Sequence, residues 1–301
     1  MQAKKKTKNR AANRERLAAL RKTLAADPEG KRLLDLARKQ RVPISFSADP
    51  KKMDALGLFD IVDRTVTLNP GEDDRALSGV LAHELRHLWQ AGVADVREKE
   101  ISATDMLVRR RLIESDAFAY EMRFHLSAQL RTMEKLSKIA ARHAASPDGR
   151  AAKKMADEAR AAFGMKAYFM KAQKKRMGVY DKTTLRSLAL QLKLAQIYAE
   201  QKKLLDAHPS KSKKLAAARR ECDQGLKNIF NRVSAPQPLD DSLVNITREG
   251  LSRRSPNYLG FTTAKELSAF IRRQIPAGTV KKARALEKKI KKTAGRALGR
   301  K

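Results

Sequence analysis

Apolar residues between positions 74 and 90 recur at the three- and four-residue intervals that mark one face of an α-helix. Acidic residues at positions 72–74 follow a Pro–Gly pair, a composition that favours a helix start. The pattern predicts a helix that begins near residue 73, buries an aliphatic stripe and leaves its other face to polar groups. The stripe consists of Leu77, Val80, Leu81, Leu85 and Leu88.

Three short runs upstream of this helix have the β-branched and aromatic content of strands. They cover residues 41–47, 57–62 and 65–69, and Asp63-Arg64 is expected to join the last two as a tight hairpin. These runs predict a short antiparallel sheet beside the helix.

The rest of the chain has helical patterns. They cover residues 103–144, 151–176, 181–207 and 211–232, with breaks at 147–149 and 209–210. Thr263-Ala264-Lys265-Glu266 is a capping box that opens a further short helix. The predicted fold class is α+β, with a small core of sheet and two helices and a largely α-helical C-terminal extension.

Composition adds a strong positive charge. The chain has 66 Lys and Arg residues against 33 acidic residues, a formal net charge of +33, which favours polyanions such as nucleic acid, anionic membrane or acidic proteins. The basic runs at 4–8 and 281–301 resemble two tails, which would serve equally well as solubilising termini. Aromatic residues make up 5% and do not alternate with basic ones, so any contact with nucleic acid would be mainly through phosphates.

Cys222 is the only cysteine, so no intrachain disulfide can form. The first residues carry charge without the apolar stretch of a secretory signal, and no apolar run approaches the length of a membrane span. We therefore expect a cytoplasmic protein with no membrane span.

Residues 83–87 read His-Glu-Leu-Arg-His, the HExxH motif of hydrolytic metal sites. Helical residues four apart project from the same face, so His83 and His87 can bind one zinc ion. Glu84 then lies beside the metal, where it can take a proton from a metal-bound water and pass it to the leaving amine. The motif therefore indicates a metallopeptidase.

A catalytic zinc normally takes three protein ligands, and Glu114 on the next predicted helix is the best candidate for the third. Glu114 could instead pair with Arg110 or Arg111 on a solvated face. Asp116 is the alternative ligand, but it lies about 200° from Glu114 around the helix, so both cannot bind the metal unless the helix breaks.

The residues around the motif resemble a known family. Residues 80–90, preceded by 65–70 and followed by 113–119, are similar to a metallopeptidase domain of unknown function found in bacterial and phage proteins, and more distantly to repressor-cleaving zinc peptidases of mobile elements. In such gluzincins the third ligand is the first Glu of a Glu-x-x-x-Asp or Glu-x-x-x-Asn pattern, which falls on Glu114. Phe118 occupies the place of the Asp or Asn, so either Asp116 or a backbone carbonyl orients the ligand histidine, or the metal site is weak.

The resemblance covers roughly residues 40 to 130 and implies a zincin-like core. We divide the chain into a basic N-terminal helical segment (1–40), a zincin-like metallopeptidase core (41–145), a helical bundle extension (146–233), and a linker with short helices and a basic tail (234–301).

The expected activity is zinc-dependent hydrolysis of peptide bonds in a protein or peptide, with Glu84 as general base. Tyr120 is a candidate for oxyanion support, and the strand Thr65-Val66-Thr67-Leu68-Asn69 is a candidate edge that holds an extended substrate. One alternative is a basic, nucleic-acid-associated protein in which the zincin fold is an inactive scaffold. Another is a peptidase that acts on DNA-bound proteins.

Overall fold

The computed structural model describes the backbone of residues 2–93, 101–143, 164–208 and 212–300, and the side chains of 11–92, 101–131, 164–208 and 212–300. It is mostly helical with one three-stranded sheet, which confirms the α+β class. The predicted breaks at 147–149 and 209–210, and residues 151–163 of a predicted helix, lie outside the described residues.

The chain forms two compact units, which we describe separately. Unit 1 comprises residues 1–96, 113–172 and 245–260, and unit 2 comprises residues 97–112, 173–244 and 261–301. The four predicted segments with boundaries at 40, 145 and 233 stay a prediction. No described helix has an apolar stretch long enough to cross a lipid bilayer.

In unit 1, two helices cover the N-terminal part that was predicted as one helical segment. α1 (Gln2–Ala25) and α2 (Pro28–Lys39) are separated at Asp27, whose carboxylate caps α2 by accepting hydrogen bonds from the Glu29 and Gly30 amides. A Cβ on Gly30 would lie 2.3 Å from the Leu24 carbonyl oxygen, so only glycine lets the two helices approach this closely. Both helices pack against α3 (Asp74–Val93).

The sheet of unit 1 has three strands, β1 (Ile44–Phe46), β2 (Gly57–Asp60) and β3 (Thr65–Leu68), in the order β1-β3-β2. β3 pairs antiparallel with β2 and parallel with β1, so the prediction of a purely antiparallel sheet was wrong. The α1–α2 pair precedes β1, and the short 3-10 helix η1 (Pro50–Lys52) lies between β1 and β2. This longer connection allows β1 to lie on the far side of β3.

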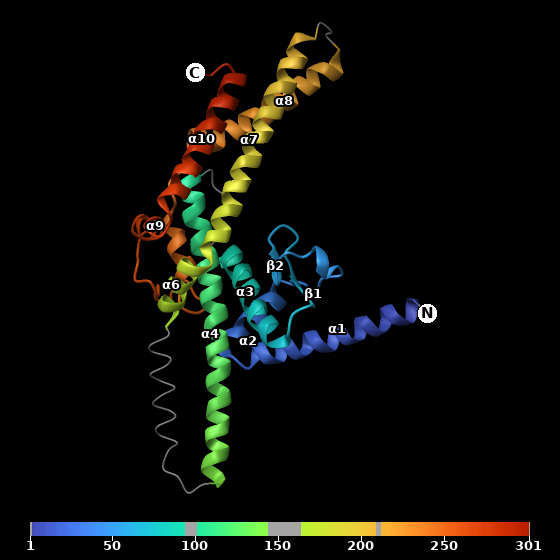
Figure 1. Ribbon diagram of the computed structural model, residues 1–301, viewed down its shortest axis with the longest axis vertical. Coiled ribbons are helices and arrows are strands. Elements are labelled where there is room, and N and C mark those ends of the chain that lie inside the picture. Colours follow the sequence, from blue (N-terminus) through green and yellow to red (C-terminus); the bar gives the residue numbers. More distant parts are fainter. Residues whose placement is uncertain (1, 94–100, 144–163, 209–211, 301) are drawn as a thin grey trace. The chain divides into compact units, whose positions relative to one another are not determined.

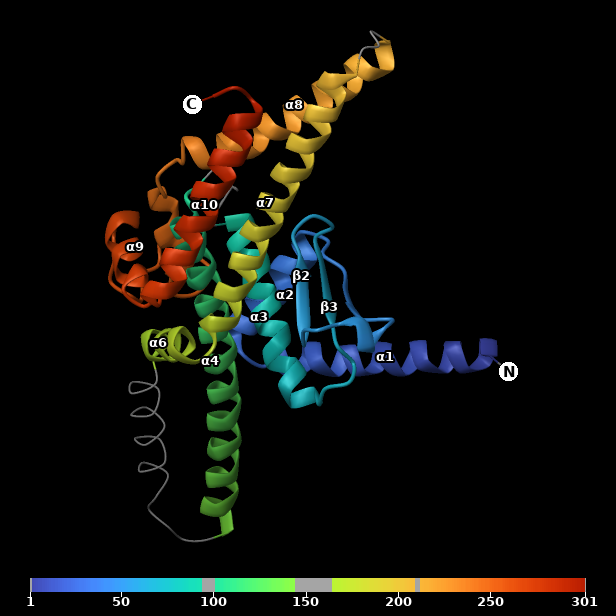
Figure 2. The ribbon, with the colours of Figure 1, turned by 45° about the horizontal axis from the view of Figure 1, so that its top comes forward.

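α3 packs on β2 and β3 and buries its predicted aliphatic stripe (Figure 1 and Figure 2). All five stripe residues are at most 5% exposed, and Trp89 is also buried. Polar residues on the remaining face of α3 are held by α4 (Ala103–His143), whose later part belongs to unit 1. The core of this unit consists of Leu20, Leu24, Leu33, Ala37, Val42, Ile44, Val66, Leu68, Leu77, Val80, Leu81, Ala82, Leu85, Leu88, Trp89 and Phe124.

Unit 2 is a helical assembly in which three long helices pack against one another (Figure 1). Its elements include α7 (Met177–Ala207), α8 (Lys213–Ser234), α9 (Ala264–Arg272) and α10 (Ala277–Ala297), while α6 (Met165–Lys175) and the 3-10 helix η2 (Asp241–Thr247) span residues of both units. Thr263 Oγ1 accepts from the Glu266 amide at 3.3 Å, which confirms the predicted cap of α9. The segment that was predicted as a basic tail is largely the helix α10.

A buried ion pair joins the first turns of α4 to α7 within unit 2. Arg111 donates to both carboxylate oxygens of Asp181, at 2.8 and 2.6 Å, and also to Gln173 Oε1 and the Gln274 carbonyl oxygen. Both side chains of the pair are at most 6% exposed. Removing one partner therefore leaves a buried charge without compensation.

We expect Asp181→Ala to lower the free energy of unfolding of the full chain by about 3–5 kcal/mol, measured by urea denaturation. The matched control is Asp206→Ala, whose half-exposed carboxylate pairs with Lys202 at the surface and which should cost at most about 1 kcal/mol. Equal losses in the two variants would show that the buried pair does not hold this unit together.

Candidate metal centre

Three side chains from α3 and α4 converge in unit 1. His83 Nε2 and His87 Nε2 lie 3.0 Å apart, and Glu114 Oε2 lies 3.7 Å from the first and 3.6 Å from the second. In their plane, the point equidistant from the three atoms lies about 2.0 Å from each, which is a metal–ligand distance. Among the described residues, these three form the one group of three or more whose donor atoms could share a metal ion.

The local geometry of two helices produces this convergence. His83 and His87 are one turn apart on α3, so both imidazoles leave the same face. Glu114 lies on α4, and its carboxylate closes the triangle from the facing helix. The structure therefore brings His83, His87 and Glu114 together, while the Asp116 carboxylate binds Arg86 instead.

Opposite charges in this cluster stabilise one another. Burial alone would lower the pKa of His83, but the carboxylates of Glu114, Glu121 and Glu84 raise it to about 10. Burial also opposes a charged His87, yet Glu114 raises the pKa of that imidazole. The two histidines in turn hold the pKa of Glu114 well below its usual range, although burial acts to raise it. Without metal, a proton on His83 therefore balances part of the negative charge of these carboxylates.

Glu121 lies beside His83 on the side away from the triangle. Its Oε2 lies 3.3 Å from His83 Nδ1, and the ring of Phe118 packs edge-on against the same imidazole at 4.5 Å between centroids. A carboxylate on the second nitrogen of a ligand histidine fixes the ring and makes it a stronger donor. Glu121 was not among the predicted site residues, although its spacing of seven residues from Glu114 places both on one helix face.

Gln90 performs the corresponding role for His87. Its Oε1 lies 2.8 Å from His87 Nδ1, and its Nε2 donates to Asp116 Oδ2 at 2.7 Å and to the Ile113 carbonyl oxygen at 3.0 Å. Because the amide can accept from His87 and donate to Asp116 at once, it relays the orientation of the carboxylate to the imidazole. Gln90 was also missed, and its position three residues after His87 was the available signal.

Asp116 is fully buried and is not part of the triangle. Its carboxylate accepts from Arg86 Nε at 2.6 Å, from the Tyr258 hydroxyl at 2.8 Å and from Gln90. The orienting role predicted for Asp116 stays a prediction. The carboxylate does not contact His87 directly, because the Gln90 amide lies between them.

The Tyr120 hydroxyl makes its hydrogen bond away from the triangle. Its ring lies on the Arg86 guanidinium, 3.8 Å from Cζ to the ring centroid, and its hydroxyl donates to the Gly250 carbonyl oxygen at 2.7 Å. Burial next to Asp116 raises the pKa of the phenol above its usual value despite the opposing charge of Arg86. The single hydroxyl proton is therefore already used, which argues against the predicted oxyanion role.

Glu84 is buried beside the histidines and is held by β2. Its Oε2 accepts from the Phe59 amide at 2.8 Å. A Cβ on Gly57 would lie 2.9 Å from Glu84 Oε1 and 2.5 Å from Val80 Cγ1, closer than real Cβ contacts, so only glycine lets β2 pass here. The strand next to Glu84 is therefore β2.

The predicted substrate strand was misplaced. Thr65, Val66, Thr67 and Leu68 form β3, which is paired on both sides, and the Asn69 amide donates to the Leu56 carbonyl oxygen. A central strand has no free backbone edge to offer a peptide. The prediction failed because strand order depends on long-range pairing that the local pattern of Thr65–Asn69 does not reveal.

Comparison with known proteins identifies a family. A family model described as "Putative metallopeptidase family (DUF6782)" matches residues 1–163, a span that contains all three residues of the triangle and Glu84. No curated protein and no solved structure matches the chain.

Protonation of the metal-free site leads to a prediction about metal binding. A divalent cation has to displace the proton of His83, whose pKa is raised to about 10, and any proton on His87, whose pKa is also raised. Near pH 7 we expect up to two protons to be released per Zn²⁺ or Co²⁺ bound, so that affinity falls by up to about 100-fold for each unit decrease in pH. Calorimetric titrations in two buffers of different ionisation enthalpy measure this number. Binding without proton release would contradict the assigned protonation states.

Proposed function

The chain belongs to this putative metallopeptidase family, and on that premise we propose that it hydrolyses peptide bonds with a zinc ion held by His83, His87 and Glu114. The single observation that carries the proposal is the triangle of donor atoms, with its equidistant point about 2.0 Å from each atom. Zinc binds histidine nitrogen at about 2.0–2.1 Å and carboxylate oxygen at about 2.0–2.2 Å. Two imidazoles and one carboxylate also leave a fourth position for water or substrate.

The surroundings of the triangle support catalysis as well as binding. A bound zinc would acidify a water molecule and polarise the scissile carbonyl. Glu84 follows a ligand histidine directly and is not part of the triangle, so it is free to accept the proton of that water and deliver it to the leaving amine. The Phe59 amide, which donates to Glu84 Oε2, keeps this carboxylate in place while no substrate is bound.

The position of β2 supports an extended peptide as substrate. β2 is an outer strand of the sheet, and its Phe59 amide points toward Glu84, away from β3. A peptide that pairs along this edge would pass beside the catalytic carboxylate. Leu58, which is 53% exposed on β2, would meet a side chain of that peptide. We therefore assign to β2 the substrate-holding role that was predicted for β3.

A zincin-like core is part of the same proposal. The HExxH helix α3, the glutamate-bearing helix α4 and the small sheet are the elements that such a core requires. The ligand set and Glu84 are all present and lie together, which favours turnover over an inactive scaffold.

The role of Glu84 is tested by Glu84→Gln. The amide keeps the shape of the side chain but cannot accept a proton, so we expect zinc content near that of the wild type and a loss of hydrolysis of about 100-fold or more. Zinc content is measured by mass spectrometry and hydrolysis with an unfolded protein substrate such as casein. Unchanged hydrolysis in this variant would overturn the proposed mechanism.

The ligand assignment is tested by comparing Glu114→Gln with Asp116→Asn. Loss of a direct ligand should abolish zinc retention on dialysis, whereas loss of an outer-shell carboxylate should weaken zinc affinity by about 10- to 100-fold. Both variants keep side-chain volume, which limits packing effects. If Asp116→Asn loses the metal and Glu114→Gln keeps it, Asp116 is the ligand and the present assignment is wrong.

A further inference from the structure

α10 carries an unusually dense and one-sided positive charge. Over its 21 residues it has eight basic residues and one acidic residue, and all eight basic side chains are exposed. The acidic residue, Glu287, is engaged inside unit 2, where it accepts from the Ala103 amide at 2.9 Å. The basic residues are Lys281, Lys282, Arg284, Lys288, Lys289, Lys291, Lys292 and Arg296.

The eight cations share one half of the helix surface. At about 100° per residue they fall within an arc of about 180°, and the buried Ala283, Ile290 and Ala294 lie opposite the middle of that arc. Lys281, Lys288, Lys292 and Arg296 form its centre. Lys282 and Lys289 form one edge, and Arg284 and Lys291 form the other. At a rise of about 1.5 Å per residue, the basic face is therefore about 22 Å long, and each of its two flanks has two cations about 10 Å apart.

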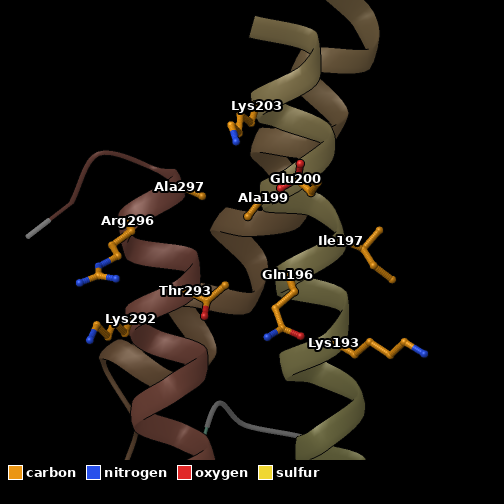
Figure 3. A pocket seen from close by; sticks show the side chains of 10 residues that line it. All are labelled: Lys193, Gln196, Ile197, Ala199, Glu200, Lys203, Lys292, Thr293, Arg296 and Ala297. Carbon is orange, nitrogen blue, oxygen red and sulfur yellow. The ribbon is translucent and has the colours of Figure 1, made fainter. Parts of the chain in front are cut away.

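Packing within unit 2 keeps this half of the helix outward. α10 packs on α7 and α8, and a groove of about 1160 Å³ runs between α7 and α10. Lys292 and Arg296 are among the residues that line this groove. Figure 3 shows Thr293 and Gln196 facing each other across it, while the charged ends of Lys292 and Arg296 point away from α7. Lys193 and Lys203 add two cations on the α7 side, against the single carboxylate of Glu200.

We propose that this basic face, defined as the eight cations of α10, binds B-form duplex DNA through its phosphates. The major groove is about 12 Å wide and admits a helix of about 10–12 Å diameter. A helix that enters with its exposed half presents one flank of cations to each bordering phosphate strand. A-form RNA offers a deep and narrow major groove that does not admit this face in the same way.

Other polyanions fit the face less well. An anionic membrane would meet only the centre of the arc, and α10 itself offers no exposed large apolar side chain, since Ile290 is buried and Val280 and Leu286 are partly buried. Single-stranded nucleic acid is usually held by stacking on aromatic rings, and α10 has no aromatic residue. Recognition would be of the phosphate backbone, with little sequence preference, because no base-reading pattern accompanies the lysines.

The binding face stands independently of the metal centre. It lies beyond residues 1–163, the span matched by the metallopeptidase family model, and belongs to unit 2. Duplex binding by Glu84→Gln should therefore equal that of the wild type. If the peptidase proposal fails, the DNA proposal can still be judged by itself.

The test uses the full chain, a fluorescent duplex of about 20 base pairs and anisotropy between about 50 and 200 mM salt. The flank variant replaces Lys282, Arg284, Lys289 and Lys291 with glutamine. The matched control replaces four exposed basic residues of α8 with glutamine and so removes the same charge elsewhere in unit 2. These residues are Lys213, Lys214, Arg220 and Lys227. Circular dichroism checks that both variants remain folded.

We expect the flank variant to bind about 100-fold or more weakly at 100 mM salt, and its plot of log K against log salt to be flatter by about 3. The α8 variant should stay within about threefold of the wild type. Equal loss in both variants, or no loss in the flank variant, would overturn the proposal.

A further variant distinguishes binding to duplex DNA from binding to a flat membrane surface. The centre variant replaces Lys281, Lys288, Lys292 and Arg296 with glutamine and is compared with the flank variant on vesicles of equal parts phosphatidylserine and phosphatidylcholine. Stronger binding to vesicles than to duplex, lost with the centre variant alone, would replace the DNA proposal with a membrane one. Equal binding to duplex DNA, duplex RNA and polyglutamate would reduce the face to a general polyanion attractor and would also overturn it.

Discussion

The buried ion pair between Arg86 and Asp116 is the interaction on which the candidate metal centre depends. Both side chains are completely shielded from solvent, so every polar atom needs a partner. Arg86 meets this need by donating to Asp116 and to the carbonyl oxygens of Ile246, Arg248 and Gly250. Because Asp116 also accepts from Gln90, which contacts His87, the pair joins α3, α4 and residues 245–260 into the support of one metal ligand.

Residues that support the candidate metal centre also lie outside the span matched by the family model. The matched span ends at residue 163, whereas the Tyr258 hydroxyl and three backbone carbonyl groups of residues 245–260 complete the surroundings of Asp116 and Arg86. The three candidate ligands all lie within the match. A segment far along the chain therefore supplies hydrogen-bond partners to Arg86 and Asp116, which lie behind the candidate ligands.

Local features of the chain could be predicted, and features that depend on long-range pairing could not. The HExxH helix, its aliphatic stripe and the placement of His83, His87 and Glu84 follow from about 100° of rotation per residue, which the sequence displays directly. The order of the strands depends on which strands pair, and β1 and β3 are far apart in the sequence. The central strand β3 was therefore predicted as an edge strand. Gln90 and Glu121 were missed because their importance appears only when α3 and α4 face each other. The basic C-terminus was taken for a tail because composition does not reveal that α7 and α8 pack against it.

X-ray absorption at the zinc edge, recorded on the full chain loaded with one equivalent of zinc, tests the central assignment most directly. The proposal predicts two imidazole nitrogens and carboxylate oxygen at about 2.0–2.2 Å, with the imidazole signal lost when His83 and His87 are both replaced by alanine. A spectrum dominated by sulfur, or one that keeps its imidazole signal in that double variant, would contradict it, because the metal would then be bound elsewhere.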